Sequence, residues 1–399
     1  MSSRLIQLLA TQSEGFDLVQ DKCIYELSRF LSTSLTIQII PSVSNCIENS
    51  ILIICSKDLL KYKKAIIDLN LSILICDPKI NSLIEIDLFD HTIGYIVSSI
   101  EQRSCWSWSN KFIAILPMYK DYGDDLAPLL ENIPFSLLNT NKKVVLYHGN
   151  RIHFENFLAR NSRSIKFLTH THLFVTVYNI KVLGKYDPSK YNLDSSSFVH
   201  IQYDHKTLLN LSQYSDLGIV PNLLPGNTSF FDDLFHLRFF RINHMFELFD
   251  HTLRFKSSSN AGRCHFFAYS NIPVVAEVTP SICCFVDHSY NGFLFMNDSD
   301  LLDCFDQAMN LSDSQRRLFS ERLLLKFDQS SHRAYTQLLN FLLSDIHTVL
   351  NLKESLSPRA HNILLKKFNY ILGLFYFRAN FFKRIKAFLL KLLNIKHYL

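Results

Sequence analysis

Short apolar runs that alternate with helical patterns constrain the fold of this chain more than any other feature. Within residues 1–117, these runs are rich in Ile and Leu and have the length of strands that are buried on both faces. Helical patterns accompany them at residues 17–31 and 59–69. Because strands that alternate with helices form parallel sheets, an α/β domain is expected here. The predicted strands occupy residues 35–40, 50–55, 71–76, 92–99 and 112–117.

A second series of apolar runs begins after an acidic and polar stretch at residues 118–141, which we interpret as a linker. A chain of 399 residues is too long for one ordinary core, so the second series indicates another α/β domain over residues 142–346. The expected fold class is therefore α/β, with two Rossmann-like domains and a C-terminal helical tail. The predicted strands of the second domain occupy residues 144–150, 167–179, 197–204, 216–224, 272–277 and 292–295.

The charged residues are unevenly distributed. Nine of the 41 Lys and Arg residues lie in residues 355–399, which contain no Asp or Glu, so the remainder carries 32 basic against 36 acidic groups. A mildly acidic body argues against nucleic acid as a partner. The tail, residues 347–399, has the apolar period of an amphipathic helix, and its longest uncharged run of ten residues is too short to cross a membrane. We expect the tail to contact an anionic membrane surface through residues 355–399; the alternative is a helix docked on the first domain.

The nine cysteines form no C-x-x-C pair, and the first residues lack the pattern of a signal peptide. Free thiols in a reducing compartment are therefore expected, with no metal site. His170 and His172 would share one face of a predicted strand, but no acidic residue or cysteine lies near them in sequence. The expected location is cytoplasmic, and peripheral on the inner face of the plasma membrane if the tail binds lipid.

The strongest functional pattern lies at the start of a short predicted helix. Lys256 and Arg263 flank a Ser/Asn run that includes Ser258 and Asn260. A helix N-terminus presents unpaired N–H groups and a partial positive charge, which suit an anion and above all a phosphate. An apolar strand follows at residues 272–277, so the helix begins near the carboxyl ends of strands, where open α/β sheets bind ligands. The alternative is an ordinary surface helix whose cations face water.

The order of Lys256, small polar run, Arg263, helix and apolar strand, followed by NGFLF, resembles the C-terminal domain of GT-B glycosyltransferases, in particular the group 1 glycosyl transferases. The run VVLYHGN resembles the first strand of that domain, and residues 203–223 resemble its helix–strand unit. The resemblance implies two domains that face each other across a cleft. It implies no metal and no cofactor, because the nucleotide sugar is the substrate. It also implies a donor-phosphate site made by Gly149, Asn150, Lys256, Ser258, Asn260 and Arg263.

The chain departs from the family pattern at two positions. Many group 1 enzymes carry two glutamates eight positions apart at this helix, the second seven residues before the proline. Counted back from Pro273, these positions hold Phe266 and Ser258, so a carboxylate that would contact the donor sugar or ribose is missing. Either the chain belongs to a divergent branch that relies on Lys256 and Arg263, or its donor chemistry is altered, or its activity is lost.

An inverting glycosyltransferase also needs a base in its first domain to deprotonate the acceptor hydroxyl. Asp77 directly follows the apolar run at residues 71–76, and Glu101 lies in SSIEQR, which resembles a loop that faces the cleft in the family. Asp77 and Glu101 are therefore the candidate catalytic residues, with His91 as a further candidate. A retaining enzyme needs no such base.

The predicted function is transfer of a hexose from a nucleotide-diphosphate sugar to an envelope glycan or a lipid-linked acceptor, as in polysaccharide biosynthesis. Two alternatives stay open. One is a non-catalytic relative that binds nucleotide or glycan, in line with the missing glutamates. The other is a nucleotide-sugar epimerase, which would turn over its donor without an acceptor.

Overall fold

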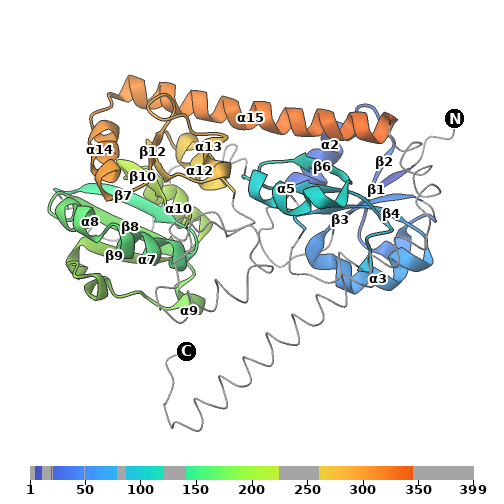
Figure 1. Cartoon of the computed structure of the whole chain (residues 1–399), viewed down its shortest axis with the longest axis horizontal. Coiled ribbons are helices and arrows are strands. Elements are labelled where there is room, and N and C mark those ends of the chain that lie inside the picture. The colour runs from blue at the N-terminus through green and yellow to red at the C-terminus, as the bar shows by residue number, and fades with distance from the viewer. Residues whose placement is uncertain are drawn as a thin grey trace, which may run out of the picture. The chain divides into compact units, whose positions relative to one another are not determined.

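The structure, a computed structural model, describes residues 5–10, 19, 21–48, 50–78, 87–120, 141–223 and 260–344, and every structural statement concerns these residues (Figure 1). The chain divides into two compact units, Met1–Leu339 and Asn340–Leu399, and both sheets belong to the first unit. The predicted site residues Lys256 and Ser258 lie outside the described residues, as does the tail.

The first domain is built on a six-stranded parallel sheet in the order β2-β1-β3-β4-β5-β6. Strands β3, β4 and β5 are buried along their whole length, which explains why their sequences are continuous apolar runs. The strands are β1 (Ile6–Leu9), β2 (Ile37–Ile40), β3 (Ile51–Cys55), β4 (Ser72–Cys76), β5 (Thr92–Val97) and β6 (Phe112–Ile115). The helical elements are η1 (Asp21–Glu26), α2 (Leu27–Leu31), η2 (Val43–Asn45), η3 (Ser56–Asp58), α3 (Leu59–Asp68), α5 (Ile100–Trp106) and η4 (Ser107–Ser109).

The second domain is built on another six-stranded parallel sheet, in the order β12-β11-β10-β7-β8-β9. The strands are β7 (Lys143–His148), β8 (His172–Tyr178), β9 (Phe198–Gln202), β10 (Leu217–Val220), β11 (Val274–Glu277) and β12 (Phe293–Phe295). The chain first builds outward from β7 in one direction and then resumes at β10 in the other. This is the Rossmann strand order, and it places a topological switch point between β7 and β10.

Helices cover both faces of the second sheet (Figure 1). One apolar cluster joins the sheet to α7 (Arg151–Arg160), α8 (Ser162–Leu168) and α14 (Asp298–Met309). The other joins it to α10 (His205–Ser212), α12 (Gly262–Tyr269), α13 (Pro280–Cys283) and α15 (Asp313–Ser344). The remaining helical elements are α9 (Ile180–Leu183), η6 (Pro188–Tyr191) and η7 (Ser195–Ser197).

The approach of α12 to β10 is unusually close. A Cβ atom on Gly218 of β10 would lie only 2.3 Å from the ring of Phe267 in α12, so no larger residue fits there without displacing the helix. Phe267 itself is fully buried. This contact packs the last turn of α12 against the start of β10, while Arg263 in the first turn bonds the Pro221 carbonyl just after β10.

The predicted α/β fold with two domains built on parallel sheets is confirmed, and every predicted strand overlaps an observed one, although β8 starts at His172 instead of residue 167. The sequence missed β1, because a polar residue interrupts its apolar run. That residue, Gln7, is fully buried, and its Oε1 accepts hydrogen bonds from the Ile47 N–H (2.9 Å) and the Ser50 hydroxyl (2.8 Å). The expectation that His170 lies on a strand is wrong, since the chain turns there and β8 starts at His172.

The predicted domain boundaries stay a prediction, because most of the proposed linker lies outside the described residues. No helix in the described part of the chain combines the length and apolar character that a membrane span requires.

Candidate functional site

The switch point between β7 and β10 is where a doubly wound sheet leaves room for a ligand, because the connections from these two neighbouring strands depart in opposite directions. His148 ends β7, and Val220 ends β10. The residues that follow these strands, together with the first turn of α12, form the candidate site.

The turn after β7 is built around Gly149. Its φ of +136° lies in a region that favours glycine, and a Cβ atom there would lie 3.1 Å from Tyr147 Oη and 3.3 Å from Arg263 Nη1. Asn150 caps α7, since its side chain accepts a hydrogen bond from the Ile152 N–H (3.1 Å). The glycine therefore lets the Arg263 guanidinium lie directly against the turn.

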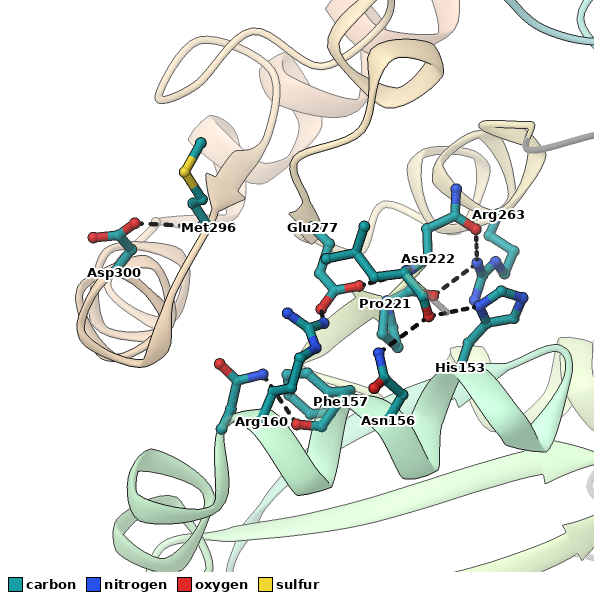
Figure 2. A network of polar contacts seen from close by, with 12 residues as sticks. His153, Asn156, Phe157, Arg160, Pro221, Asn222, Arg263, Glu277, Met296 and Asp300 are labelled. Atoms are coloured by element: carbon teal, nitrogen blue, oxygen red, sulfur yellow. Dashed lines mark hydrogen bonds and ion pairs between the residues drawn. The ribbon is translucent and has the colours of Figure 1, made fainter. Parts of the chain in front are cut away.

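Arg263 is the second residue of α12, and its guanidinium is only partly used by the protein (Figure 2). Nη2 donates to the Pro221 carbonyl (2.8 Å) and to Asn222 Oδ1 (2.7 Å). Nη1 is buried and makes no hydrogen bond of good geometry among the described residues, although the guanidinium lies close to the Tyr147 hydroxyl and interacts with it. A buried charged donor without an acceptor is costly, and a phosphate oxygen would remove this cost by accepting its hydrogen bond.

Asn260 acts at the start of α12. Its Oδ1 accepts a hydrogen bond from the Gly262 N–H (2.7 Å), and this bond fixes the backbone between Asn260 and the first residue of α12. The expectation that Asn260 belongs to the helix start is therefore met in geometry, while a direct contact with phosphate stays a prediction.

His148 is an apolar rather than a cationic part of the site. Its ring packs edge-on against Phe266 (4.7 Å between centroids) and Phe267 (5.4 Å). Burial, together with the positive charge of Arg263, lowers the pKa of His148 to about 3. The imidazole is thus neutral at pH 7, and the positive charge of this group of residues comes from Arg263.

Two solved structures that share this arrangement of two sheets are both distant in sequence. HepE of Anabaena in complex with UDP has a TM-score of 0.54 at 12% identity, covering 86% of this chain and 100% of HepE. Sucrose-phosphate synthase of Thermosynechococcus elongatus has a TM-score of 0.51 at 10% identity, covering 84% of this chain and 97% of the synthase. The chain has the GT-B fold. No family model and no curated protein matches the sequence.

In this GT-B chain, Phe266 takes the position at which the group 1 glycosyl transferases have their second glutamate. Its side chain is fully buried within the apolar cluster that joins α12 to the second sheet. A glutamate could not occupy this packing without leaving a carboxylate buried against apolar groups. The local packing of α12 against His148 is therefore built for an aromatic residue.

The two candidate bases lie in the first domain of the GT-B fold, close to the ends of β4 and β5. Asp77 follows β4 in a left-handed conformation (φ +50°), and its Oδ1 accepts a hydrogen bond from Gln102 Nε2 (2.9 Å). Gln102 is the neighbour of Glu101 in the first turns of α5, so the two carboxylates share one edge of the first sheet.

Glu101 is 5% exposed and is already engaged with the second domain. Its Oε1 accepts hydrogen bonds from the Ser281 N–H (3.0 Å) and hydroxyl (2.8 Å) at the start of α13. Burial raises the pKa of Glu101, although the hydrogen bonds from Ser281 act in the opposite direction. Its other oxygen, Oε2, has no hydrogen-bond partner in the described part of the chain.

The structure brings Gly149, Asn150 and Arg263 together, as the sequence predicts, and adds partners that the sequence did not indicate. Asn222 and the Pro221 carbonyl hold Arg263, and Glu277 holds the same segment from the other side (Figure 2). A charged residue at the end of an otherwise apolar strand was the available sign for Glu277. Across the described ranges, no group of three or more His, Cys, Asp or Glu side chains could hold a metal ion.

Proposed function

We propose that this chain is a glycosyltransferase that transfers a hexose from a nucleotide-diphosphate sugar. The observation that carries the proposal is Arg263 Nη1, a buried donor without a hydrogen bond of good geometry among the described residues, lying against Gly149 at the switch point of the second sheet. The GT-B fold supports it, since solved structures of HepE from Anabaena contain UDP, UDP with glucose, or UDP-glucose.

The proposed role of Arg263 follows from the charge that develops during transfer. Cleavage of the bond between the sugar and the diphosphate leaves negative charge on the departing phosphate oxygen, and a preorganised guanidinium stabilises it. Gly149 lets the phosphate approach the backbone, and Asn260 holds the start of α12. Lys256 and Ser258, which lie outside the described residues, are proposed as further phosphate ligands. Because the guanidinium supplies positive charge, the proposal includes no metal or cofactor.

For the acceptor side, Asp77 and Glu101 are both kept as proposed bases. Asp77 is more accessible, whereas one oxygen of Glu101 is bonded to Ser281. The raised pKa of Glu101 makes it a stronger base than an ordinary glutamate once it has lost its proton. A retaining enzyme would use neither residue in this way.

The test is a panel of UDP-, GDP- and ADP-sugars incubated with the full chain, with and without a lipid extract and with EDTA. We expect release of one nucleoside diphosphate that requires the extract and persists in EDTA. Release in no combination, together with absence of nucleotide binding, would overturn the proposal.

A second function is favoured by Phe266. If the aromatic residue in place of the family's glutamate abolishes turnover, the chain binds nucleotide or glycan without catalysis. In the same panel, this alternative gives saturable binding of a nucleotide sugar, measured by calorimetry, with no release of nucleoside diphosphate under any condition.

We further propose that the acceptor is an envelope glycan or a lipid-linked sugar and that the protein works at the cytoplasmic face of the plasma membrane. The support is the basic tail. Replacing Lys383, Arg384 and Lys386 together by Gln should weaken co-sedimentation with anionic liposomes about 100-fold, since each basic residue near such a surface contributes about 1 kcal/mol. Equal binding by the variant and the native chain would instead support a tail docked on protein.

A further inference from the structure

The position of the Arg263 guanidinium depends on one short segment that follows β10. Both of its acceptors, the Pro221 carbonyl and Asn222 Oδ1, belong to this segment, and both are bonded to the same nitrogen, Nη2. Any change in the backbone of residues 221–223 would therefore move the acceptors that orient the guanidinium. What holds this segment also determines where Nη1 points.

Glu277, the last residue of β11, holds the segment from the side opposite Arg263 (Figure 2). Its Oε2 accepts two hydrogen bonds from adjacent backbone groups, the N–H of Asn222 (2.7 Å) and the N–H of Leu223 (2.8 Å). The Glu277 side chain is only 2% exposed. A buried carboxylate is tolerated when charge and hydrogen bonds compensate it, and here two backbone donors do part of this.

Helix α7 supplies the rest of the compensation. Arg160 forms an ion pair with Oε1 of Glu277 and is itself 27% exposed, so the pair joins the inside of the protein to its surface. One turn before Arg160 in the same helix, Asn156 Nδ2 donates to the Leu223 carbonyl (3.3 Å). His153 Nδ1 lies 3.0 Å from the same carbonyl, which can only accept, so this nitrogen carries the proton. The segment is thus fixed at both its N–H and its C=O groups.

We propose that Glu277, supported by Arg160, is a positioning residue for the donor-phosphate arginine. The carboxylate fixes the peptide groups of residues 222 and 223, these fix the acceptors of Arg263 Nη2, and Nη1 is left aimed at the phosphate. This inference rests on the proposed function, because it assigns Arg263 to the donor diphosphate. Its consequence is specific: Glu277 affects nucleotide binding only through Arg263.

The experiment measures UDP, GDP and ADP binding by calorimetry to the full chain and to Glu277→Gln, each with Arg263 intact and with Arg263→Ala. In Glu277→Gln, an amide replaces the carboxylate. The NH2 group of the amide must then face either Arg160 or the two backbone N–H groups, which are all donors, so one set of hydrogen bonds is lost. We expect the affinity for the preferred nucleotide to fall about tenfold with Arg263 intact. With Arg263→Ala, the further loss from Glu277→Gln should be less than about twofold, as for two residues on one path.

The matched control is Asp216→Asn. Asp216 lies just before β10, at the edge of the second sheet opposite to the one where Glu277 ends β11. Asp216 also accepts a backbone hydrogen bond, from the Val144 N–H (2.8 Å), and also pairs with a cation, Lys143 (3.2 Å). It has the same kinds of partner as Glu277 but precedes β10 instead of facing its carboxyl end. Nucleotide affinity in this variant should equal that of the native chain.

If Glu277→Gln does not fold, Arg160→Met and Arg160→Lys give the same information. Arg160→Met should weaken nucleotide binding severalfold by leaving the carboxylate without its cation, and Arg160→Lys should restore it. Unchanged affinity in Glu277→Gln, or an equal loss with and without Arg263, would overturn the inference while the proposed function stands. If the native chain binds none of the three nucleotides, the proposed function fails and the inference falls with it.

Discussion

Replacing Arg263 with alanine is expected to slow sugar transfer by about 100- to 1000-fold while the protein stays folded. The reason is the growing negative charge on the departing diphosphate, which loses the Nη1 donor. Among the native contacts that the variant loses are two hydrogen bonds, to the Pro221 carbonyl and to Asn222 Oδ1, and the contact with the Tyr147 ring. The measurement is the steady-state rate of nucleoside diphosphate release, with the circular dichroism melting curve as the check on folding.

Two further variants show whether the effect belongs to the position or to the charge. Arg263→Lys keeps the charge but cannot bond two acceptors on one nitrogen and a phosphate on another, so an intermediate rate is expected. Arg322→Ala removes an arginine of α15 that also donates to a carbonyl, that of Tyr290 (3.1 Å), and lies over the Tyr290 ring. Arg322→Ala should leave the rate unchanged. A normal rate in Arg263→Ala would remove Arg263 from the mechanism.

The fold was predictable because its strands are buried on both faces and are therefore continuous apolar runs. Strand β1 escaped prediction for the same reason, since Gln7 breaks its run. In the folded chain, the Ile47 N–H and the Ser50 hydroxyl satisfy this buried glutamine, and both partners lie some 40 residues further along the chain. No local sequence pattern can predict hydrogen-bond partners that are so far away along the chain.

The candidate site was predictable in part. Gly149 and Arg263 could be found because a turn after a strand and a cation at a helix start each have a local pattern. Asn222 has no such pattern, and the acidic residue that ends an apolar strand marks Glu277 as unusual without revealing its role, since both roles come from the packing of α7, β10 and β11 against one another. For Phe266, the sequence and the structure each supply half of the interpretation. The sequence showed a missing glutamate, and only the structure shows the aromatic packing that occupies its place.

Lys22 shows most clearly where sequence patterns mislead. Lys22 and Glu26 are four residues apart, the spacing of an ordinary pair on a helix surface. In the structure the Lys22 side chain is 2% exposed, its Nζ is 2.6 Å from Glu26 Oε2, and it lies 3.6 Å from the centre of the Tyr119 ring. Glu26 also accepts a hydrogen bond from the Tyr335 hydroxyl of α15 (3.2 Å). A pair with the spacing of an exposed ion pair is thus largely buried, and it connects η1 to α15 through the Tyr335 hydroxyl.

Replacing Glu26 with alanine is therefore expected to lower the free energy of unfolding of the first domain by about 3 kcal/mol, because it leaves the buried Lys22 ammonium without its carboxylate. Lys22→Met, which removes the buried charge itself, should cost less, and adding it to Glu26→Ala should recover part of the loss. Asp87→Ala is the control: its pair with Lys63 is as short (2.6 Å) but is 36% and 45% exposed, so a change of at most about 0.5 kcal/mol is expected. Urea unfolding followed by tryptophan fluorescence measures this domain selectively, since both tryptophans, Trp106 and Trp108, belong to it. Equal destabilisation by Glu26→Ala and Asp87→Ala would show that the burial of Lys22 has no energetic consequence.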